Sequence, residues 1–376
     1  MPAPTSTATA IGACPRCLAR SWLLAALAGH LDRARGRLAE LLALEDEELI
    51  RAVAGRRRAE LQRELLDFPA FQAEAALDQA RRLGLELICG CHARYPRRLR
   101  DLEAPPAVVH VAGGAARLLD RLGGDAVAIV GARAASPYGL GVAHSLARSL
   151  AVAGVGVISG LALGIDAAAH EGSLAAPAPP AGGAPIAVLP GSAHRPYPAA
   201  NRRLYRRLLG VGNAVSELPP QAPIRGWTFA ARNRLIAALA AMTVVVEADE
   251  RSGALITARF AAELGRPVGA VPGPVTAPQS RGCNALLRGC AEPVRHAQDV
   301  LDALYGAGRR HAPEDPRPAL SAELSHLLAA IAGGHDTLAA LDRRGLLGTD
   351  GLAALARLEL AGYIRRAAGG RYVALA

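Results

Sequence analysis

The stretch RGWTFAARNRLIAALA, residues 225–240, concentrates side chains of the kinds that bind other molecules. Aromatic residues make up only 3% of the 376-residue chain, yet Trp227 and Phe229 both lie here beside three arginines. A helical pattern over ARNRLIAALA leads into the apolar strand MTVVVEA. The first turn of that helix is expected to hold Arg232, Asn233 and Arg234. These side chains are therefore predicted at the edge of a buried sheet.

Four further loops each follow a predicted strand and contain glycine, serine, asparagine or arginine. In parallel α/β sheets the carboxyl ends of the strands meet at one edge, and ligands bind there. The residues expected at that edge are Gly131 and Arg133 in VAIVGARAASPYGLG, Ser159 and Gly160 in ISGLALGIDAAAH, Ser252, Gly253 and Thr257 in EADERSGALITARFAAELG, and Ser280, Gly282 and Asn284 in PGPVTAPQSRGCNALLRGCA.

The first of these loops is suited to a phosphate. A strand that runs through glycines into a helix points backbone N–H groups and a helix N-terminus at an anion. The dinucleotide fingerprint is not matched, because Gly131 and Gly139 lie eight residues apart and no acidic residue ends the second strand. Arg133 is placed to clamp the phosphate with its planar guanidinium group. The loop therefore predicts phosphate binding without NAD.

The chain contains no lysine, which excludes several classes of enzyme. A P-loop, Schiff-base chemistry and a lysine general base all need that residue. Ser252 stands in R-S-G and not in G-x-S-x-G, so the serine-hydrolase elbow is missing as well. Asp166 and His170 have i, i+4 spacing but no third metal ligand, and Asp166 is interpreted as a helix cap or loop organiser. The edge predicts a binding platform and not a reaction centre.

Composition favours a cytoplasmic protein with a polyanionic partner. The formal net charge is +10, although an arginine-rich composition alone is the other interpretation. The N-terminus lacks the regions of a signal peptide. The apolar runs at 151–165 and 235–246 are too short to span a membrane, so no membrane contact is expected.

Six cysteines in such a chain are expected to be thiols or metal ligands and not disulfides. Cys14-x-x-Cys17 and Cys89-x-Cys91 together predict a four-thiolate zinc site that joins the N-terminal segment to the sheet. C-x-x-C is a usual half-site, whereas C-x-C is tighter than usual and His92 is an alternative ligand. Four unrelated thiols are the competing interpretation, and no cofactor other than this zinc is expected.

The pattern of the chain predicts several segments. Short apolar strands alternate with helical stretches from about Pro105, which predicts a doubly wound, mostly parallel α/β sheet with helices on both faces. The insert AAPAPPAGGAP at 175–185 is interpreted as a mobile surface loop. The expected segments are a disordered tail at 1–15, a small helical domain at 16–92, the α/β domain at 93–305, a linker at 306–318 and a winged helix of three helices and a hairpin at 319–376.

These motifs, in this order, resemble the DNA-processing protein A (DprA/Smf) family. The resemblance rests on AIVGAR-ASPYG, SGLALGIDAAAH, AVLPG-YP-N, SELPP, F-RNRLIAAL, VVVEADERSGALITA, AVPGP and S-RGCNALLRGCA, and covers about residues 93–305. It implies an extended Rossmann-like fold between a SAM-like helical domain and a winged helix. It also implies a homodimer, not an enzyme, that binds single-stranded DNA and loads the RecA recombinase during natural transformation.

The resemblance also assigns roles to particular residues. Phosphate binding falls on Gly131, on Arg133 and on the RNR motif at 232–234, and a base contact falls on Phe229. Rings would then stack on bases while guanidinium groups hold phosphates. The departures from the family pattern are Ala132 in place of serine, Leu163 in place of a basic residue and Ala230 in place of proline.

Two other functions compete with this interpretation. A Rossmann-like nucleoside-monophosphate phosphoribohydrolase would need a PGG-x-GT-x-x-E motif, and LPGSAHRPYP lacks both the GT and the glutamate. A regulator that reads DNA through the winged helix would use TDGLAALARLELAG, which offers Arg357 and two acidic residues and is a poor reader of the major groove.

Overall fold

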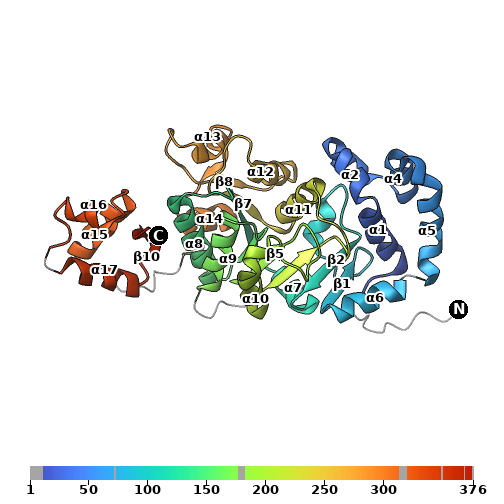
Figure 1. Ribbon diagram of the computed structural model, residues 1–376, viewed down its shortest axis with the longest axis horizontal. Coiled ribbons are helices and arrows are strands. Elements are labelled where there is room, and N and C mark those ends of the chain that lie inside the picture. Colours follow the sequence, from blue (N-terminus) through green and yellow to red (C-terminus); the bar gives the residue numbers. More distant parts are fainter. Residues whose placement is uncertain are drawn as a thin grey trace.

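The computed structural model describes residues 12–71, 73–176, 183–312, 320–348, 350–367 and 369–374. Residues 1–11 of the predicted tail, most of the predicted mobile insert and residues 313–318 of the predicted linker lie outside the described residues. Figure 1 shows the N-terminal helices at one end of the molecule, the sheet with its helices in the middle and the C-terminal helices at the other end.

The N-terminal segment is helical, as its leucine-rich pattern predicts. Its helices are α1 (Pro15–Ala26), α2 (Ala28–Arg33), α3 (Leu38–Ala43), α4 (Asp46–Val53), α5 (Arg58–Phe71) and α6 (Ala73–Arg82), with short 3-10 turns η1 (Arg35–Arg37) and η2 (Gly55–Arg57). Acidic residues fill the first turn of α4, where they complement the positive end of the helix dipole. Apolar residues of α1 to α5 form one buried cluster that extends onto Trp227, whereas Ala73 and Ala80 of α6 pack with the sheet.

One sheet forms the centre of the molecule. Its strands are β1 (Leu85–Cys89), β2 (Val108–Ala112), β3 (Ala126–Val130), β4 (Gly156–Ser159), β5 (Pro185–Val188), β6 (Asn213–Ser216), β7 (Met242–Val245), β8 (Val268–Ala270) and β9 (Glu292–Pro293). Their order is β1-β2-β6-β5-β4-β3-β7-β8-β9 within the described residues. Only the pairs β1–β2 and β2–β6 are antiparallel among the pairs of this sheet. The carboxyl ends of β3 to β8 therefore meet at one edge, which we call the rim.

Helices cover both faces of the sheet, as continuous apolar strands require. They are α7 (Ala115–Arg121), α8 (Pro137–Val152), α9 (Ile165–Leu174), α10 (Arg202–Val211), α11 (Gly226–Leu239), α12 (Gly253–Glu263), α13 (Arg281–Arg288) and α14 (Ala297–Tyr305), with 3-10 turns η3 (Arg97–Asp101), η5 (Ala199–Asn201) and η6 (Pro278–Ser280). The predicted mixed α/β architecture with a mostly parallel sheet is confirmed.

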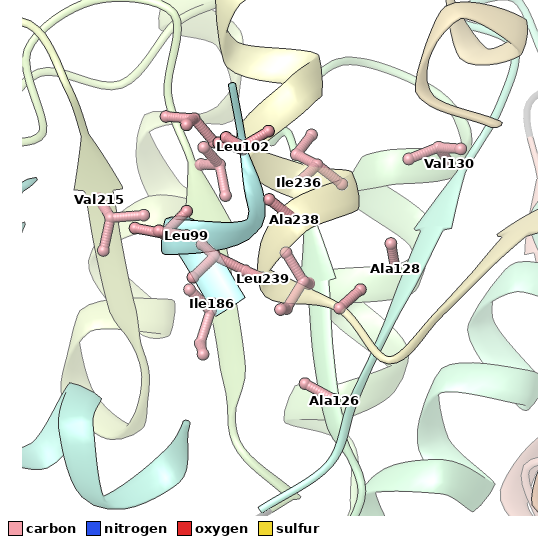
Figure 2. Packing of buried hydrophobic residues seen from close by; sticks show 14 of the residues in the cluster. Leu99, Leu102, Ala126, Ala128, Val130, Ile186, Val215, Ile236, Ala238 and Leu239 are labelled. Atoms are coloured by element: carbon pink, nitrogen blue, oxygen red, sulfur yellow. The ribbon is translucent and has the colours of Figure 1, made fainter. Parts of the chain in front are cut away.

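Alternate residues of one strand belong to different layers of the core. Ala126, Ala128 and Val130 of β3 pack with α11 and η3 on one face (Figure 2). Val127 and Ile129 pack with α8 and α9 on the other face. This period of two is the geometry of a strand buried on both sides. It holds the loop after β3 rigidly between two helical layers.

The sheet begins earlier in the chain than predicted. Leu85–Cys89 lies within the segment assigned to the helical domain, yet it forms β1 and pairs with β2 along its whole length. The predicted boundary at residue 92 is therefore wrong as a limit of the sheet. Five residues with one exposed side chain give too short a pattern to distinguish an edge strand from the end of a helix.

The C-terminal segment contains the predicted three helices and hairpin. They are α15 (Ala322–Ala332), α16 (Leu338–Asp342), α17 (Gly351–Leu360), β10 (Ile364–Ala367) and β11 (Arg371–Ala374). Gly369 and Gly370 both have positive φ, which suits the turn between the two strands. These elements share their own apolar cluster. The winged-helix assignment stays a prediction.

No helix in the described part of the chain is long and apolar enough to cross a membrane.

Two buried histidines make the stability of the fold depend on pH. Burial lowers the pKa of His110 to about 4 and that of His170 to about 3, from an ordinary value of 6.5. Below pH 6.5 the unfolded chain binds protons that the folded chain does not. The free energy of unfolding therefore decreases as the pH is lowered. Between pH 7.5 and pH 5 we expect a loss of roughly 2 kcal/mol per histidine.

Urea unfolding at several pH values measures this loss. The double variant His110→Gln, His170→Gln should show a flatter profile than the parent over the same range. A parent whose free energy of unfolding is constant from pH 7.5 to pH 5 would contradict the expectation.

Candidate functional site

The rim contains a cavity of about 490 Å³. It lies among the loop after β3, the first half of α11 and the N-terminus of α12. An adjoining cavity of about 150 Å³ extends toward the loop after β5. Both cavities are lined by Arg133, Ala162, Phe229 and Arg232. The site therefore consists of two adjoining cavities, and the Phe229 ring lines both of them.

The ring of Phe229 is held from two sides. The guanidinium carbon of Arg133 lies 5.2 Å from the centre of the Phe229 ring, within range of a cation–π contact. The ring of Tyr197 meets Phe229 edge to face, with centroids 5.5 Å apart. Arg133 and Tyr197 are exposed and Phe229 is half-buried. The three side chains form a fixed aromatic platform open to solvent.

The helix that carries this ring begins five residues before the predicted ARNRLIAALA helix. α11 starts at Gly226, and the Thr228 hydroxyl at its N-terminus donates to the Arg225 carbonyl at 2.9 Å. Phe229 therefore lies in the first turn, and the RNR motif lies about a turn deeper. The prediction that Arg232, Asn233 and Arg234 occupy the first turn is wrong. The Thr228 hydroxyl, which also accepts from the Arg225 N–H at 3.4 Å, supplies the local start signal that the prediction overlooked.

Arg232 and Asn233 face the interior and not the solvent. The Arg232 guanidinium donates to the carbonyls of Gly160, at 2.5 Å, and Val188, at 3.1 Å, while its Nε donates to Asn233 Oδ1. The Asn233 amide donates to the Gly253 carbonyl at 3.2 Å. Burial lowers the pKa of Arg232, which the carboxylate of Asp166 opposes. Both side chains thus join α11 to loops of the rim.

Arg234 forms a buried ion pair with Glu217. Their side chains are only 9% and 4% exposed. Arg234 also donates to the Ala104 carbonyl at 2.5 Å. Burial raises the pKa of Glu217, and the charge of Arg234 opposes that shift. The pair fixes α11 to the segments after β6 and before β2. We therefore do not retain the direct phosphate contacts predicted for Arg232 and Arg234.

The N-terminus of α8 already holds an anion. The buried carboxylate of Glu247 accepts from the backbone N–H of Ser136 at 2.8 Å and from the Ser136 hydroxyl. The predicted helix-terminus phosphate site of this loop is therefore occupied by the protein's own side chain. Gly131 is required here for packing, since a Cβ would lie 2.6 Å from Ile165. The exposed Arg133 is the part of this loop that can meet a ligand.

The loop after β4 also serves the fold. The Ser159 hydroxyl is fully buried and donates to the Ile129 carbonyl at 2.7 Å, so its predicted ligand contact does not fit the structure. A Cβ on Gly160 would lie 1.7 Å from the Arg232 guanidinium. The Asp166 carboxylate accepts from the N–H groups of Gly160, at 3.1 Å, and Ala162, at 3.3 Å. Asp166 is thus the predicted loop organiser.

The N-terminus of α12 opens into the larger cavity. Ser252 caps this helix by accepting from the Ala254 N–H at 3.3 Å. Gly253 is exposed, and a Cβ there would meet nothing within 4 Å. Thr257 lines the cavity one turn later, although it is buried. The structure therefore brings together the three predicted residues of this loop, with a helix N-terminus that suits an anion.

Two residues of the site escaped the sequence prediction. Arg35, an exposed residue of η1, lines the larger cavity from the helical segment. Tyr197, in the HRPYPAAN stretch, lines the smaller cavity. Aromatic residues are rare in this chain, and that rarity was the sequence signal that could have marked Tyr197 as a site residue. Trp227, by contrast, is fully buried, and its indole N–H donates to the Ala28 carbonyl at 2.9 Å. Among the departures from the family pattern, Leu163 is 46% exposed and lines the smaller cavity.

Comparison with known proteins identifies the family. The model of the DNA recombination-mediator protein A family matches residues 86–305, more than half of the chain. The chain belongs to this family. A putative DNA processing protein DprA from Mycobacterium tuberculosis is 42% identical over 274 residues, covering 70% of this chain and 68% of the relative. Membership places the chain among DNA-processing proteins.

Two solved structures of the family are similar to this chain. The DNA processing protein A from Streptococcus pneumoniae aligns with a TM-score of 0.58 at 32% identity, over 69% of this chain and 86% of that one. The Helicobacter pylori protein, described for its unique single-stranded DNA binding mode, aligns with a TM-score of 0.50 at 30% identity, over 56% of this chain and 92% of that one. The family region starts inside β1, in agreement with the sheet and not with the predicted boundary.

Proposed function

We propose that this chain binds single-stranded DNA at the rim, in the cytoplasm, and does not turn it over. The observation that supports this most is the Phe229 ring, fixed between Arg133 and Tyr197 and lining two adjoining cavities. Aromatic rings beside guanidinium groups are the usual platform for unpaired bases. The Helicobacter pylori relative described as binding single-stranded DNA supports the same class of ligand.

A single strand has what each part of the site can bind. An unpaired base offers a π face to Phe229, while its flanking phosphates carry the negative charge that Arg133 and Arg35 attract. The N-terminus of α12 at Gly253 adds backbone N–H groups for a further phosphate. In a duplex the bases are stacked on one another and cannot reach the ring. The site should therefore prefer single strands.

Phosphate contacts by Arg133 and Arg35 have a measurable signature. Arg133→Ala and Arg35→Ala should each weaken binding of a dT oligomer and flatten the slope of log K against log salt by about 0.7. Arg56→Ala is the matched control, because Arg56 is an exposed arginine of the helical segment that does not line either cavity. A salt titration of each variant provides the slopes. An Arg133→Ala slope equal to that of Arg56→Ala would exclude the phosphate contact.

A homodimer and delivery of the strand to RecA complete the proposal. Both rest on membership of the family and not on a feature of the rim. Light scattering at micromolar concentration tests the dimer, and RecA filament formation on DNA coated with this protein tests delivery. A monomer would contradict the first of these, and RecA assembly that is no faster than on naked DNA would contradict the second.

A hydrolase is the alternative function, and a hydrogen-bonded serine–histidine pair is the observation that bears on it. Ser192 and His194, in the loop after β5, share a hydrogen bond of 2.6 Å. Ser192 is only 6% exposed, and neither side chain lines the two cavities, so the pair does not face the proposed ligand. Incubation with AMP should release no adenine. Release at an enzyme-like rate that a substitution at the rim abolishes would favour the phosphoribohydrolase.

A further inference from the structure

Four cysteine sulfurs from two distant parts of the sequence meet at one point. The Sγ atoms of Cys14, Cys17, Cys89 and Cys91 all lie within 4.8 Å of one another. Cys17 and Cys89 are buried, Cys14 is half-buried and Cys91 is exposed. The other two cysteines of the chain, Cys283 and Cys290, are not part of the group. Random placement of thiols does not explain four of six at one point.

The distances fit a single tetrahedral ion. The Cys91 sulfur lies 3.7 Å from that of Cys17 and 4.0 Å from that of Cys14. Four sulfurs placed about 2.3 Å from a zinc ion at tetrahedral angles are about 3.8 Å apart. A disulfide requires about 2.05 Å. A multi-iron cluster needs more room than four sulfurs within 4.8 Å enclose.

Backbone hydrogen bonds and a helix start position the four thiols. Cys14 is the N-cap of α1, and Pro15 at the first helical position leaves Cys17 in the first turn. Cys89 ends β1, and its N–H donates to the Gly12 carbonyl at 3.3 Å. The Gly90 N–H then donates to the Ala107 carbonyl at 2.9 Å, which turns the chain so that Cys91 meets the other sulfurs. Each pair of thiols thus comes from a different element.

His92 is not the fourth ligand. Its Nδ1 accepts the backbone N–H of Arg94 at 3.1 Å, and it is absent from the group of converging ligand atoms. The choice between C-x-C and histidine that the spacing leaves open is therefore resolved in favour of the thiol of Cys91. The resulting donor set is four sulfurs, which suits zinc.

We propose that Cys14, Cys17, Cys89 and Cys91 bind one structural zinc ion. Zinc with four thiolates carries a net charge of −2, which the N-terminus of α1 stabilises. The ion would join the start of the helical segment to the edge strand of the sheet, and so close a chain loop between Cys17 and Cys89. In the sheet, β2 and β6 lie between β1 and β5, the nearest strand whose loop contributes to the DNA platform, so the ion and the platform would occupy different parts of the molecule. Its role is independent of the proposed function.

The experiment compares the full chain with two variants, Cys91→Ser and Cys290→Ser. Cys91 and Cys290 are both exposed, so neither substitution opens a cavity in the core, and Cys290→Ser is the matched control. Elemental analysis of protein purified without chelator should find one zinc per chain in the parent and in Cys290→Ser. Cys91→Ser should lose its metal on dialysis against a chelator that leaves the parent loaded. Replacement of zinc by Co²⁺ should give sulfur-to-cobalt charge-transfer absorption that is weaker in Cys91→Ser.

Thiol modification provides a readout within one molecule. In the loaded protein Cys290 should react quickly and Cys91 slowly, although both are exposed. Removal of the metal should make Cys91 react as quickly as Cys290. The proposal is overturned if reduced parent protein incubated with Zn²⁺ retains none after chelator dialysis, if iron replaces zinc at one ion or more per chain, or if Cys91 reacts as fast as Cys290 in the loaded protein.

Discussion

Phe229→Ala should weaken binding of single-stranded DNA by about 5- to 150-fold, because stacking of a base on an aromatic ring contributes ~1–3 kcal/mol. The loss should depend little on salt, since the substitution removes no charge. Fluorescence anisotropy of a labelled dT oligomer at two or more salt concentrations measures both features.

Two further substitutions separate stacking from simple volume. Phe229→Trp should retain most of the affinity, because a larger π face remains over the cavity. Phe229→Leu keeps an apolar side chain without a π face and should bind almost as poorly as Phe229→Ala. Equal affinities for the leucine and parent proteins would show that the ring contributes only packing and would remove the basis of the platform.

Glu217→Ala should destabilise the folded chain by about 3–5 kcal/mol, because it leaves the buried guanidinium of Arg234 without its carboxylate partner. Denaturant unfolding measures the change. Since the pair also anchors α11, the variant should bind single strands less well at temperatures near its unfolding midpoint.

The control for this change replaces both partners. Glu217→Leu combined with Arg234→Met substitutes apolar side chains for the two charges and should lose much less stability than Glu217→Ala. A loss of less than about 1 kcal/mol in Glu217→Ala, the size expected of an exposed pair, would show that the two charges are not buried together.

The strands of the sheet were well predicted from sequence wherever apolar residues run continuously. The short apolar runs predicted as strands from about Pro105 onward form β2 to β8, because burial on both faces leaves an unambiguous apolar pattern. β1 was missed because an edge strand of five residues has little pattern of its own. β9 has only two residues and depends on its partner β8 for definition.

The site was predicted less well than the fold, for a physical reason. Residue types and spacing placed Arg133, Phe229 and the α12 loop correctly at the rim. Spacing alone could not show that Arg232 and Arg234 point inward, because this depends on carbonyls and a carboxylate from distant segments. Arg35 reaches the cavity from the helical segment, which packs on α11 through Trp227 and α2, and this tertiary contact cannot be read from spacing.

The affinity of the unmodified protein for a labelled dT oligomer, measured beside a duplex of equal length at moderate salt, tests the central claim most directly. The Phe229 platform predicts clearly tighter binding of the single strand, and predicts that Phe229→Ala removes most of this preference. Equal affinity for the single strand and the duplex would contradict the account and would favour binding through the C-terminal helices and hairpin.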